Sequence, residues 1–418
     1  MPSKKYGLLG EKLGHSFSKL IHNRLGDYDY ELYSVAKEDI DEFVKSRQLC
    51  GANVTIPYKK TVMPHCDVLT DAAKKIGCVN CLSTLPDGRM MGDNTDYTGF
   101  LNLADSVGVD FKDKNVVILG SGGTSLTTRT AAADRGAKSI TIVSRSGEVN
   151  YENVYELTDT EIVINTTPVG MFPNNGEKMI DLTRFPKLCG VLDVVYNPLS
   201  TALLMEAKKL GVPCGCGLRM LVAQAKYAAE RFTDSKIDDS RIDEIEGELR
   251  AMLTNIVLVG MPGCGKSSAA KILGEKMGRE VIETDEMIEE MAGMPIPEIF
   301  AKFGEAHFRK LESEAVKTAG SRTGIIISTG GGAIKNAKNV DMMRQNAIVA
   351  WIKRPIEALS TDGRPLSKDI DTLKTMWEER KPLYQSAADI VIDNSGKIDD
   401  AVAAIMEGFD EAVGNKRT

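Results

Sequence analysis

The chain has 418 residues, of which 42% are hydrophobic and 27% are charged, enough to bury the cores of two or three globular domains. A net charge of −7 and the lack of a basic arm argue against general nucleic-acid binding. No apolar run approaches the length of a membrane span, and the N-terminus has no apolar core like that of a signal peptide. We therefore expect a cytoplasmic protein, with no membrane or nucleic-acid partner, that holds anionic ligands through local positive groups.

Short strand-like and helical stretches alternate over the first hundred residues. Strands are expected at 5–9, 30–35 and 52–57, and helices at 18–25 and 39–46. Polar side chains gather near the strand ends, where binding sites are usually built. They form three clusters: Ser16 with Ser18; Asn53 with Thr55 and Lys59; and Gly92 to Asp96. Any one cluster alone is explained as well by a cap or a turn.

Residues 114–146 have the pattern of a dinucleotide-binding βαβ unit. An apolar strand at 116–119 leads into Gly120-Ser-Gly-Gly123, followed by a helix at 127–135 and a second strand at 139–143. Ser125 replaces the third glycine of the full motif, so the turn alone is a weak signal. The second strand ends in Ser144-Arg145-Ser146, and an arginine flanked by hydroxyls suits a 2′-phosphate. The pattern favours NADP(H) over NAD(H), with a solvated surface arginine as the alternative.

Two further βα units follow, with strands at 161–165 and 190–196, and then an amphipathic helix at 219–232. The next stretch, 236–250, is strongly charged and places isoleucines and a leucine near helical spacing. We expect it to form a helical connector between two domains.

The second half of the chain opens on a glycine-rich turn. An apolar strand at 256–259 runs into Gly260-Met-Pro-Gly-Cys-Gly-Lys-Ser267, and a helical pattern follows from Ser268. This is the strand, turn and helix of a P-loop, whose backbone N–H groups surround phosphate oxygens at a helix N-terminus. Lys266 would reach the β- and γ-phosphates and the Ser267 hydroxyl would bind Mg²⁺. This half is therefore predicted to bind a nucleoside triphosphate.

Carboxylates and glycines follow the next strands. A strand at 280–285 ends in Glu283 and Asp285, and a strand at 325–328 runs into Gly330-Gly-Gly332. A helix is expected at 296–303 and a strand at 349–352.

Arginines then occur in a region with little apolar pattern. They are Arg354, Arg364 and Arg380, with Tyr384 close behind. In a nucleotide-binding domain this pattern predicts a lid that closes over phosphates. A charged surface loop is the alternative for any single arginine.

Residues from about 5 to 235 resemble shikimate dehydrogenase. The resemblance rests on Gly14-His-Ser-Phe-Ser18, Asn53-Val-Thr-Ile-Pro-Tyr-Lys59, Gly77-Cys-Val-Asn80, Asn94-Thr-Asp-Tyr-Thr-Gly99, Asn165-Thr-Thr-Pro-Val-Gly-Met171, Asp193-Val-Val-Tyr-Asn-Pro198 and Gly217-Leu-Arg-Met-Leu-Val-Ala-Gln224. It implies that Ser16 and Ser18 hold a substrate carboxylate, and that Lys59 and Asp96 form the acid–base pair. The residues implied to contact substrate hydroxyls are Thr55, Asn80, Asp96 and Gln224, and those predicted to bind NADPH are Gly120, Gly122, Gly123, Arg145 and Thr166. A lysine beside a carboxylate can supply the proton that hydride reduction of a ketone needs.

The chain departs from this family at the 2′-phosphate pocket. The family usually carries a basic residue where this chain has Leu126, and Asn-Arg-Thr where this chain has Ser144-Arg145-Ser146.

Residues from about 254 to 415 resemble shikimate kinase. The matching stretches are the P-loop, Thr284-Asp285, Phe303-Gly-Glu-Ala-His-Phe-Arg309, Gly330-Gly-Gly332, Arg364-Pro-Leu366 and Arg380-Lys-Pro-Leu-Tyr384. The resemblance implies that Asp285 orients the attacking hydroxyl, that Arg309 and Arg380 bind the shikimate carboxylate, and that Gly331 approaches the ring. The predicted ATP site consists of Gly263, Gly265, Lys266, Ser267, Ser268 and Arg364, with Ser267 as the metal ligand. Glu283 stands where the family usually has an aspartate, and its longer side chain could change the water shell of Mg²⁺.

The predicted fold is α/β, with a two-part dehydrogenase followed by a P-loop kinase that has a parallel sheet. We expect a substrate-binding part at 1–100 with a returning helix at 218–235, a Rossmann-like NADP part at 101–217, a helical connector at 236–253 and a kinase domain at 254–418. The dehydrogenase site should lie between the first two parts, and the sequence leaves the oligomeric state open.

The two resemblances name consecutive steps that share shikimate. The sequence therefore predicts NADPH-dependent reduction of 3-dehydroshikimate and ATP- and Mg²⁺-dependent phosphorylation of shikimate. One alternative is a quinate dehydrogenase that uses NAD, fused to a small-molecule kinase, and Arg145 argues against its cofactor. Another is a regulator that binds these metabolites without turnover. It predicts broken catalytic positions or an added DNA-binding arm, and the sequence shows neither.

Overall fold

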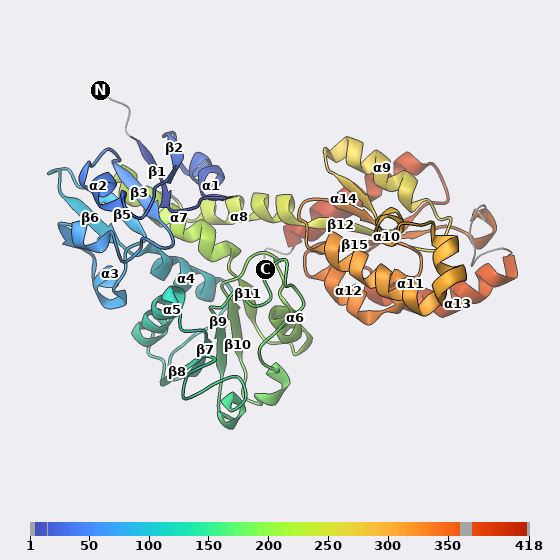
Figure 1. The fold of residues 1–418 in the computed structure, drawn as a ribbon, viewed down its shortest axis with the longest axis horizontal. Helices are drawn as coiled ribbons and strands as arrows, with labels where there is room; N and C mark the ends of the chain where they lie inside the picture. Colours follow the sequence, from blue (N-terminus) through green and yellow to red (C-terminus); the bar gives the residue numbers. More distant parts are fainter. Residues whose placement is uncertain (1–4, 15, 360–369, 416–418) are drawn as a thin grey trace. The chain divides into compact units, whose positions relative to one another are not determined.

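The computed structural model describes residues 5–14, 16–359 and 370–415, and its helices and strands are labelled along the chain in Figure 1. By their contacts the described residues divide into two units. The first runs to residue 168 and adds 179–196 and 203–246, and the second comprises 169–178, 197–202 and the chain from 247 onward. Within the described ranges, no helix is both long and apolar enough to span a membrane.

The first unit begins with a mixed sheet. Its strands are β1 (Tyr6–Gly10), β2 (Tyr30–Ser34), β3 (Gly51–Val54), β4 (Val68–Leu69), β5 (Cys81–Thr84) and β6 (Met90–Asp93), and the helices among them are α1 (Ser18–Leu25), α2 (Ile40–Lys45) and α3 (Asp71–Ile76). The strand order is β2-β1-β3-β5-β6-β4. β5 pairs antiparallel with β3 and β6, and the other pairs are parallel. The first residue of β5 therefore lies at the same edge as the last residues of β1, β3 and β6.

A second, wholly parallel sheet completes the first unit. Its strands are β7 (Asn115–Leu119), β8 (Ser139–Val143), β9 (Ile162–Asn165), β10 (Gly190–Asp193) and β11 (Cys214–Cys216), and its helices are α4 (Thr95–Ser106), α5 (Gly123–Asp134), α6 (Ala202–Lys209) and α7 (Leu218–Thr233). The order is β11-β10-β9-β7-β8. The chain returns along α7, which packs against α4 and also against β3 and β5 of the first sheet.

The connector predicted at 236–250 is the helix α8 (Ser240–Leu253). Its first turns are held by residues of α7, because Arg219 pairs with Asp243 at 2.7 Å and with Glu246 at 3.0 Å. Lys226 adds an ion pair with Asp239 at 2.8 Å. Of the apolar residues that predicted this helix, Ile242, Ile245 and Leu249 are buried.

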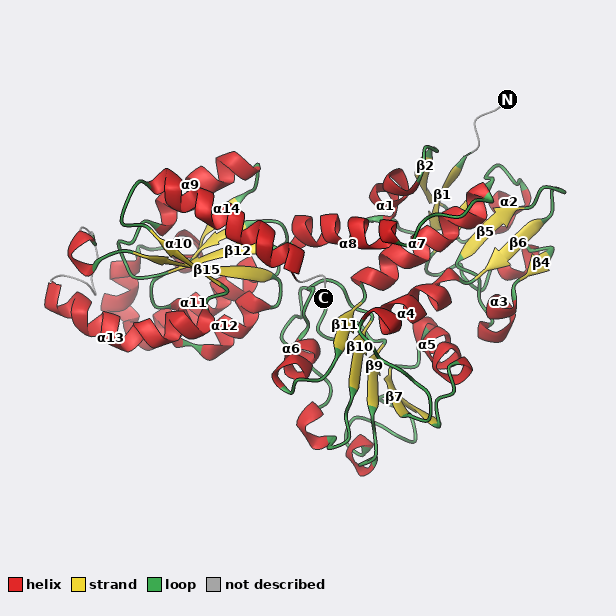
Figure 2. Ribbon diagram, turned by 180° about the vertical axis from the view of Figure 1, so that it is seen from behind, coloured by secondary structure: helices red, strands yellow, loops and turns green. Residues whose placement is uncertain are grey.

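The second unit contains a five-stranded parallel sheet with helices packed on it (Figure 2). Its strands are β12 (Asn255–Val259), β13 (Val281–Glu283), β14 (Ile326–Ser328), β15 (Ala347–Lys353) and β16 (Ile390–Asp393), and its helices after α8 are α9 (Lys266–Met277), α10 (Thr284–Ala292), α11 (Ile296–Gly320), α12 (Ala337–Arg344), α13 (Ile370–Ala387) and α14 (Ile398–Asn415). The order is β13-β14-β12-β15-β16. The central strand β12 is fully buried, as expected for a parallel sheet covered on both faces. The α/β fold class predicted from the sequence is confirmed.

Several predicted elements begin or end elsewhere. α5 begins at Gly123, four residues before the predicted helix, because the glycine turn itself forms the helix start. The strand expected at 280–285 ends at Glu283, so Asp285 lies in the first turn of α10. The helix expected at 296–303 continues to residue 320 across a break at Gly304, whose φ is 76°.

The loop predicted for the segment that contains Arg354, Arg364 and Arg380 is wrong from residue 370 onward, and its part at 360–369 lies outside the described residues. The segment expected to be a lid loop rich in arginine contains the helix α13, and Arg380 lies on its buried face with 5% of its surface exposed. Hydrophobic periodicity misses this helix because an arginine occupies a core-facing position. Of the other two arginines, Arg354 directly follows β15, and Arg364 lies outside the described residues.

The packing of α14 in the core of the second unit can be tested by substitution. Phe409 on α14 is 1% exposed, so Phe409→Ala should lower the free energy of unfolding of this unit by about 3–5 kcal/mol. Trp351 and Trp377, the only tryptophans of the chain, both belong to this unit and report its unfolding in urea by fluorescence. Phe303 is 54% exposed, and Phe303→Ala should change the same transition by about 0.5 kcal/mol or less. Equal effects would contradict the burial of α14.

Candidate active sites

A hollow of about 890 Å³ lies between the two sheets of the first unit. One side comes from β1, β3, α1 and α4, and the other comes from the start of α5, the end of β10 and α7. Its lining includes each predicted substrate-binding or acid–base residue of the dehydrogenase half: Ser16, Ser18, Thr55, Lys59, Asn80, Asp96 and Gln224. The structure thus gathers into one hollow residues that are up to 208 positions apart in the sequence.

Strand direction explains why these residues meet. Thr55 follows β3 directly, and Asn80 directly precedes β5, which runs antiparallel to β3. Strand β6 ends at Asp93, Asn94 caps α4, and Asp96 lies in the first turn of that helix, three residues after the strand. The Asn94 side chain accepts a hydrogen bond from the N–H of Tyr97 at 3.3 Å, which fixes the helix start. All three segments therefore end at one edge of the sheet.

Lys59 and Asp96 form an ion pair in this hollow. The Lys59 Nζ donates to Asp96 Oδ2 at 2.6 Å, and both side chains are largely shielded from solvent. Burial alone would lower the pKa of Lys59, but the charge and hydrogen bond of Asp96 outweigh it, so the pKa is raised above its usual value. The lysine is therefore held protonated, as a group that donates a proton must be.

A buried hydrogen-bonded chain reaches the same hollow from the first sheet. The Tyr30 hydroxyl donates to Asn53 Oδ1 at 2.9 Å, and Asn53 Nδ2 donates to Gln224 Oε1 at 3.4 Å. Gln224 Nε2 donates to the carbonyl of Leu221 at 2.9 Å, so the amide of Gln224 is oriented from both ends. Asn53 belongs to a polar cluster of the sequence, but it was not among the predicted site residues.

The dinucleotide turn lies at the carboxyl edge of the second sheet. Gly120 follows β7, its N–H donates to the carbonyl of Val143 at 2.8 Å, and its φ of 103° favours glycine. Thr166 follows β9 and donates to the carbonyl of Leu119 at 2.7 Å. Gly122 caps α5 without a side-chain hydrogen bond, and Gly123 is its first residue.

This turn fits a pyrophosphate, because the helix cap Gly122 has no side chain to bond the first N–H groups of α5. Arg145 is exposed two residues after β8, which pairs with β7 at the same edge. Arg145 therefore lies on the side toward which a dinucleotide bound at the glycine turn would extend.

A second hollow, of about 810 Å³, lies in the second unit. Of the predicted kinase residues, those that line it are Gly263, Lys266, Ser267, Asp285, Arg309, Gly331 and Arg380. Gly265 and Ser268 lie beside it at the start of α9, with Gly265 as the helix cap at a φ of 97°. An apolar wall that sequence reasoning missed is formed by Ile296, Phe300, Phe308 and Met376.

The P-loop is shaped for phosphate. Lys266 is 8% exposed, and its Nζ donates to the carbonyls of Gly260 at 3.0 Å and Met261 at 3.1 Å. Ser267 Oγ donates to Glu283 Oε2 at 3.1 Å. Burial raises the pKa of Glu283, and the nearby carboxylates of Glu286 and Asp285 raise it further.

Two guanidinium groups and a buried carboxylate form the other end of this hollow. Arg309 donates to Glu312 Oε2 at 2.8 Å, and Arg380 donates to the carbonyl of Gly331 at 3.0 Å. Glu312 is 1% exposed, and burial raises its pKa while Arg309 opposes that rise. Sequence reasoning omitted Glu312 from the site, although its spacing of three residues from Arg309 on a helix was a usable signal. Two positive groups around one cavity suit a carboxylate ligand.

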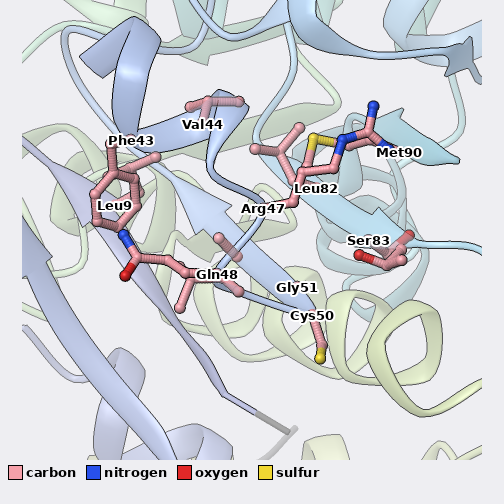
Figure 3. Close-up of a pocket in the computed structure, with 13 residues that line it drawn as sticks. Leu9, Phe43, Val44, Arg47, Gln48, Cys50, Gly51, Leu82, Ser83 and Met90 are labelled. Atoms are coloured by element: carbon pink, nitrogen blue, oxygen red, sulfur yellow. The ribbon is translucent and has the colours of Figure 1, made fainter. Parts of the chain in front are cut away.

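A third, smaller hollow of about 320 Å³ lies against the first sheet (Figure 3). Its lining is mainly apolar, with Leu9, Phe43, Val44, Leu82 and Met90 among its side chains. It contains none of the predicted site residues. The eight cysteines of the chain are free, and the part of the chain that the structure describes holds no group of three or more His, Cys, Asp or Glu that could bind a metal by itself.

Comparison with known proteins agrees with this division. The family model for the shikimate dehydrogenase substrate binding domain matches residues 8–82. The shikimate dehydrogenase (NADP(+)) of Clostridium perfringens strain SM101 is 38% identical over 268 residues, which cover 59% of this chain and 98% of that protein. The chain belongs to the shikimate dehydrogenase family. The family model for shikimate kinase matches residues 262–409, so a shikimate kinase domain follows the dehydrogenase.

Solved structures show the same fold for the first part. A chorismate mutase/shikimate 5-dehydrogenase fusion protein from Clostridium acetobutylicum is 36% identical, with a TM-score of 0.56 over 60% of this chain and 98% of that one. Shikimate dehydrogenase 1 from Peptoclostridium difficile is 33% identical, with a TM-score of 0.53 over 59% of this chain and 97% of that one. Both family resemblances inferred from the sequence are confirmed.

The Lys59–Asp96 pair predicts a measurable titration. In Asp96→Asn, burial would act on Lys59 without the opposing carboxylate, so the pKa of Lys59 should fall. The pH dependence of Lys59 acetylation by acetic anhydride, followed by mass spectrometry of the full chain, measures this shift. Asp105→Asn, the same change on the exposed side of α4, is the control and should leave the titration in place. An unchanged titration in Asp96→Asn would show that the pair does not form.

Proposed function

We propose that this chain is a bifunctional enzyme that reduces 3-dehydroshikimate to shikimate with NADPH and phosphorylates the 3-hydroxyl of shikimate with ATP and Mg²⁺. The observation that carries the proposal is that one chain collects two separate sets of residues, an acid–base pair in one hollow and a P-loop with two arginines in another. The product of the first reaction is the substrate of the second.

In the first reaction, the residues of the hollow position a ketone and protonate it. Bound NADPH supplies a hydride to the carbonyl carbon, and the C=O double bond becomes a C–O single bond. Lys59 donates its proton to the oxygen, and Asp96 stabilises the protonated lysine beforehand. Ser16 and Ser18 hold the carboxylate of the substrate, while Thr55, Asn80 and Gln224 contact its hydroxyls.

In the second reaction, a substrate hydroxyl oxygen forms a bond to the γ-phosphorus of ATP while the bond to the β-phosphate oxygen breaks. Asp285 orients that hydroxyl and accepts its proton, and Arg309 and Arg380 bind the carboxylate at the opposite end. Lys266 stabilises the negative charge on the transferring group. Bound Mg²⁺ neutralises phosphate charge, and Ser267 is one of its ligands.

The domain boundaries belong to the same proposal. Residues 1–100 with the helix near 218–235 would bind the substrate and residues 101–217 the NADPH. Residues 236–253 connect them to a kinase domain at 254–418. Contacts between α7 and the first sheet support the return of that helix to the substrate part.

A single-pot assay tests the whole proposal. Full-length protein, 3-dehydroshikimate and NADPH are incubated with and without Mg-ATP, while NADPH absorbance and the phosphate ester are followed together. NADPH should be consumed in both reactions, and shikimate 3-phosphate should form only with Mg-ATP. Loss of NADPH without any ester would refute the kinase half. No oxidation of NADPH or of NADH, tried as a second cofactor, would refute the dehydrogenase half.

Two variants should separate the activities. Lys59→Met removes the proton donor, so the dehydrogenase kcat should fall by about 10²–10⁴-fold while kinase turnover of added shikimate is retained. Asp285→Asn should do the reverse, because it removes the proposed base of the kinase alone. Both rates are measured on each purified full-length variant. A comparable loss of both activities in either variant would contradict the assignment of separate sites.

A further inference from the structure

Glu283 and Ser267 meet at the entrance of the P-loop. Glu283 is the last residue of β13, and Ser267 lies in the first turn of α9. The Ser267 Oγ and the Glu283 Oε2 are 3.1 Å apart, and both side chains line the hollow that contains Lys266 and Asp285. Two elements that are separate in the sequence thus bring two oxygen ligands side by side.

This separation fits two neighbouring ligands of one metal ion. Oxygen ligands lie 2.0–2.1 Å from Mg²⁺ in an octahedral shell, so adjacent ones are about 2.9 Å apart. Only a small movement would therefore let Ser267 and Glu283 bind the same ion. Because the described residues provide no complete metal site, the other positions fall to phosphate oxygens and water, as is usual for Mg²⁺ beside a nucleotide.

The charge of Glu283 is not neutralised by a side chain. Within the described part of the chain, no lysine or arginine forms an ion pair with it, and its side-chain hydrogen-bond partners, Ser267 and Ser328, are neutral. Arg279, the nearest basic residue in the sequence, donates instead to the carbonyls of Thr254 and Ala251. Lys266 is held by two carbonyls of the P-loop. A half-buried carboxylate without a cation is unfavourable, and a divalent ion beside Ser267 would relieve that cost.

The length of the side chain decides how the carboxylate can reach such an ion. An aspartate at this position would hold its carboxylate back by about one carbon–carbon bond, or 1.5 Å. Its oxygen would then stand too far from Ser267 to share the ion directly, and a water molecule would fill the gap. Glutamate closes this gap without a water.

We propose that Glu283 is a direct ligand of the nucleotide-bound metal ion, beside Ser267, and replaces a water molecule of its shell. The proposal rests on the kinase function proposed above and adds to it the composition of the metal shell. It concerns a residue that differs from the aspartate usual at this position in shikimate kinases.

Mn²⁺ with ADP on the full-length protein gives a direct readout. Water enriched in ¹⁷O broadens the electron paramagnetic resonance lines of Mn²⁺ in proportion to the number of bound water molecules. Glu283→Asp should bind one more water than the wild type. Glu286→Asp, the same shortening on a neighbouring exposed carboxylate, is the matched control and should keep the wild-type number.

A second variant tests the proposal independently in case Glu283→Asp does not fold. Glu283→Gln keeps the length of the side chain and loses its charge, so it should keep the wild-type water number while its affinity for Mn²⁺ with ADP falls on the order of tenfold or more. Tryptophan fluorescence in urea shows whether each variant is folded.

Two results would overturn the proposal in distinguishable ways. Equal water numbers in the wild type and folded Glu283→Asp, or an unchanged affinity in Glu283→Gln, would refute the ligand role of Glu283 alone. A wild-type protein that binds no Mn²⁺ with ADP would refute it together with the kinase function.

Discussion

Hydrogen bonding between parallel strands places their carboxyl ends along one edge of a sheet, and both candidate sites depend on this constraint. Thr55 follows β3, Gly120 follows β7 and Gly260 follows β12, so each stands at such an edge. The one reversed strand of the first sheet obeys the same geometry, because the start of β5 lies beside the end of β3 and brings Asn80 there. If β5 ran parallel to β3, Asn80 would lie at the opposite edge of the sheet, away from the site.

Each site also contains one shielded ion pair, Lys59 with Asp96 and Arg309 with Glu312. Such pairs contribute little net stability, because removing two charges from water costs about as much as their attraction returns. The role of these pairs is to hold charged groups in place within each hollow. Asp96 keeps a proton on the lysine that is proposed to donate it, and Glu312 holds a guanidinium at the hollow where a carboxylate is proposed to bind. Stability within each unit comes instead from apolar strands such as β12.

Sequence patterns predicted those elements whose buried face is apolar, and they failed where a polar residue faces inward. The strand at 256–259 was predicted because each of its residues is apolar, and each is buried in β12. α13 was missed since Arg380 occupies its buried face between Met376 and Tyr384. Motifs named candidate residues that line both hollows, yet Glu312 was omitted because a carboxylate on a helix resembles a solvated residue until its burial is known. Burial by distant segments is a tertiary property that local spacing does not encode.

The position of Arg380 in a helix changes how the kinase would recognise its substrate. An arginine in a lid loses conformational entropy when the ligand binds, whereas a buried arginine on a helix has already lost it during folding. Arg380 donates to the carbonyl of Gly331 at 3.0 Å, and the Tyr384 hydroxyl donates to the same carbonyl at 2.5 Å. These bonds fix the guanidinium relative to the glycine segment that lines the same hollow. The groups proposed to bind the carboxylate and to approach the ring are therefore pre-arranged relative to each other, independently of any closure over the nucleotide.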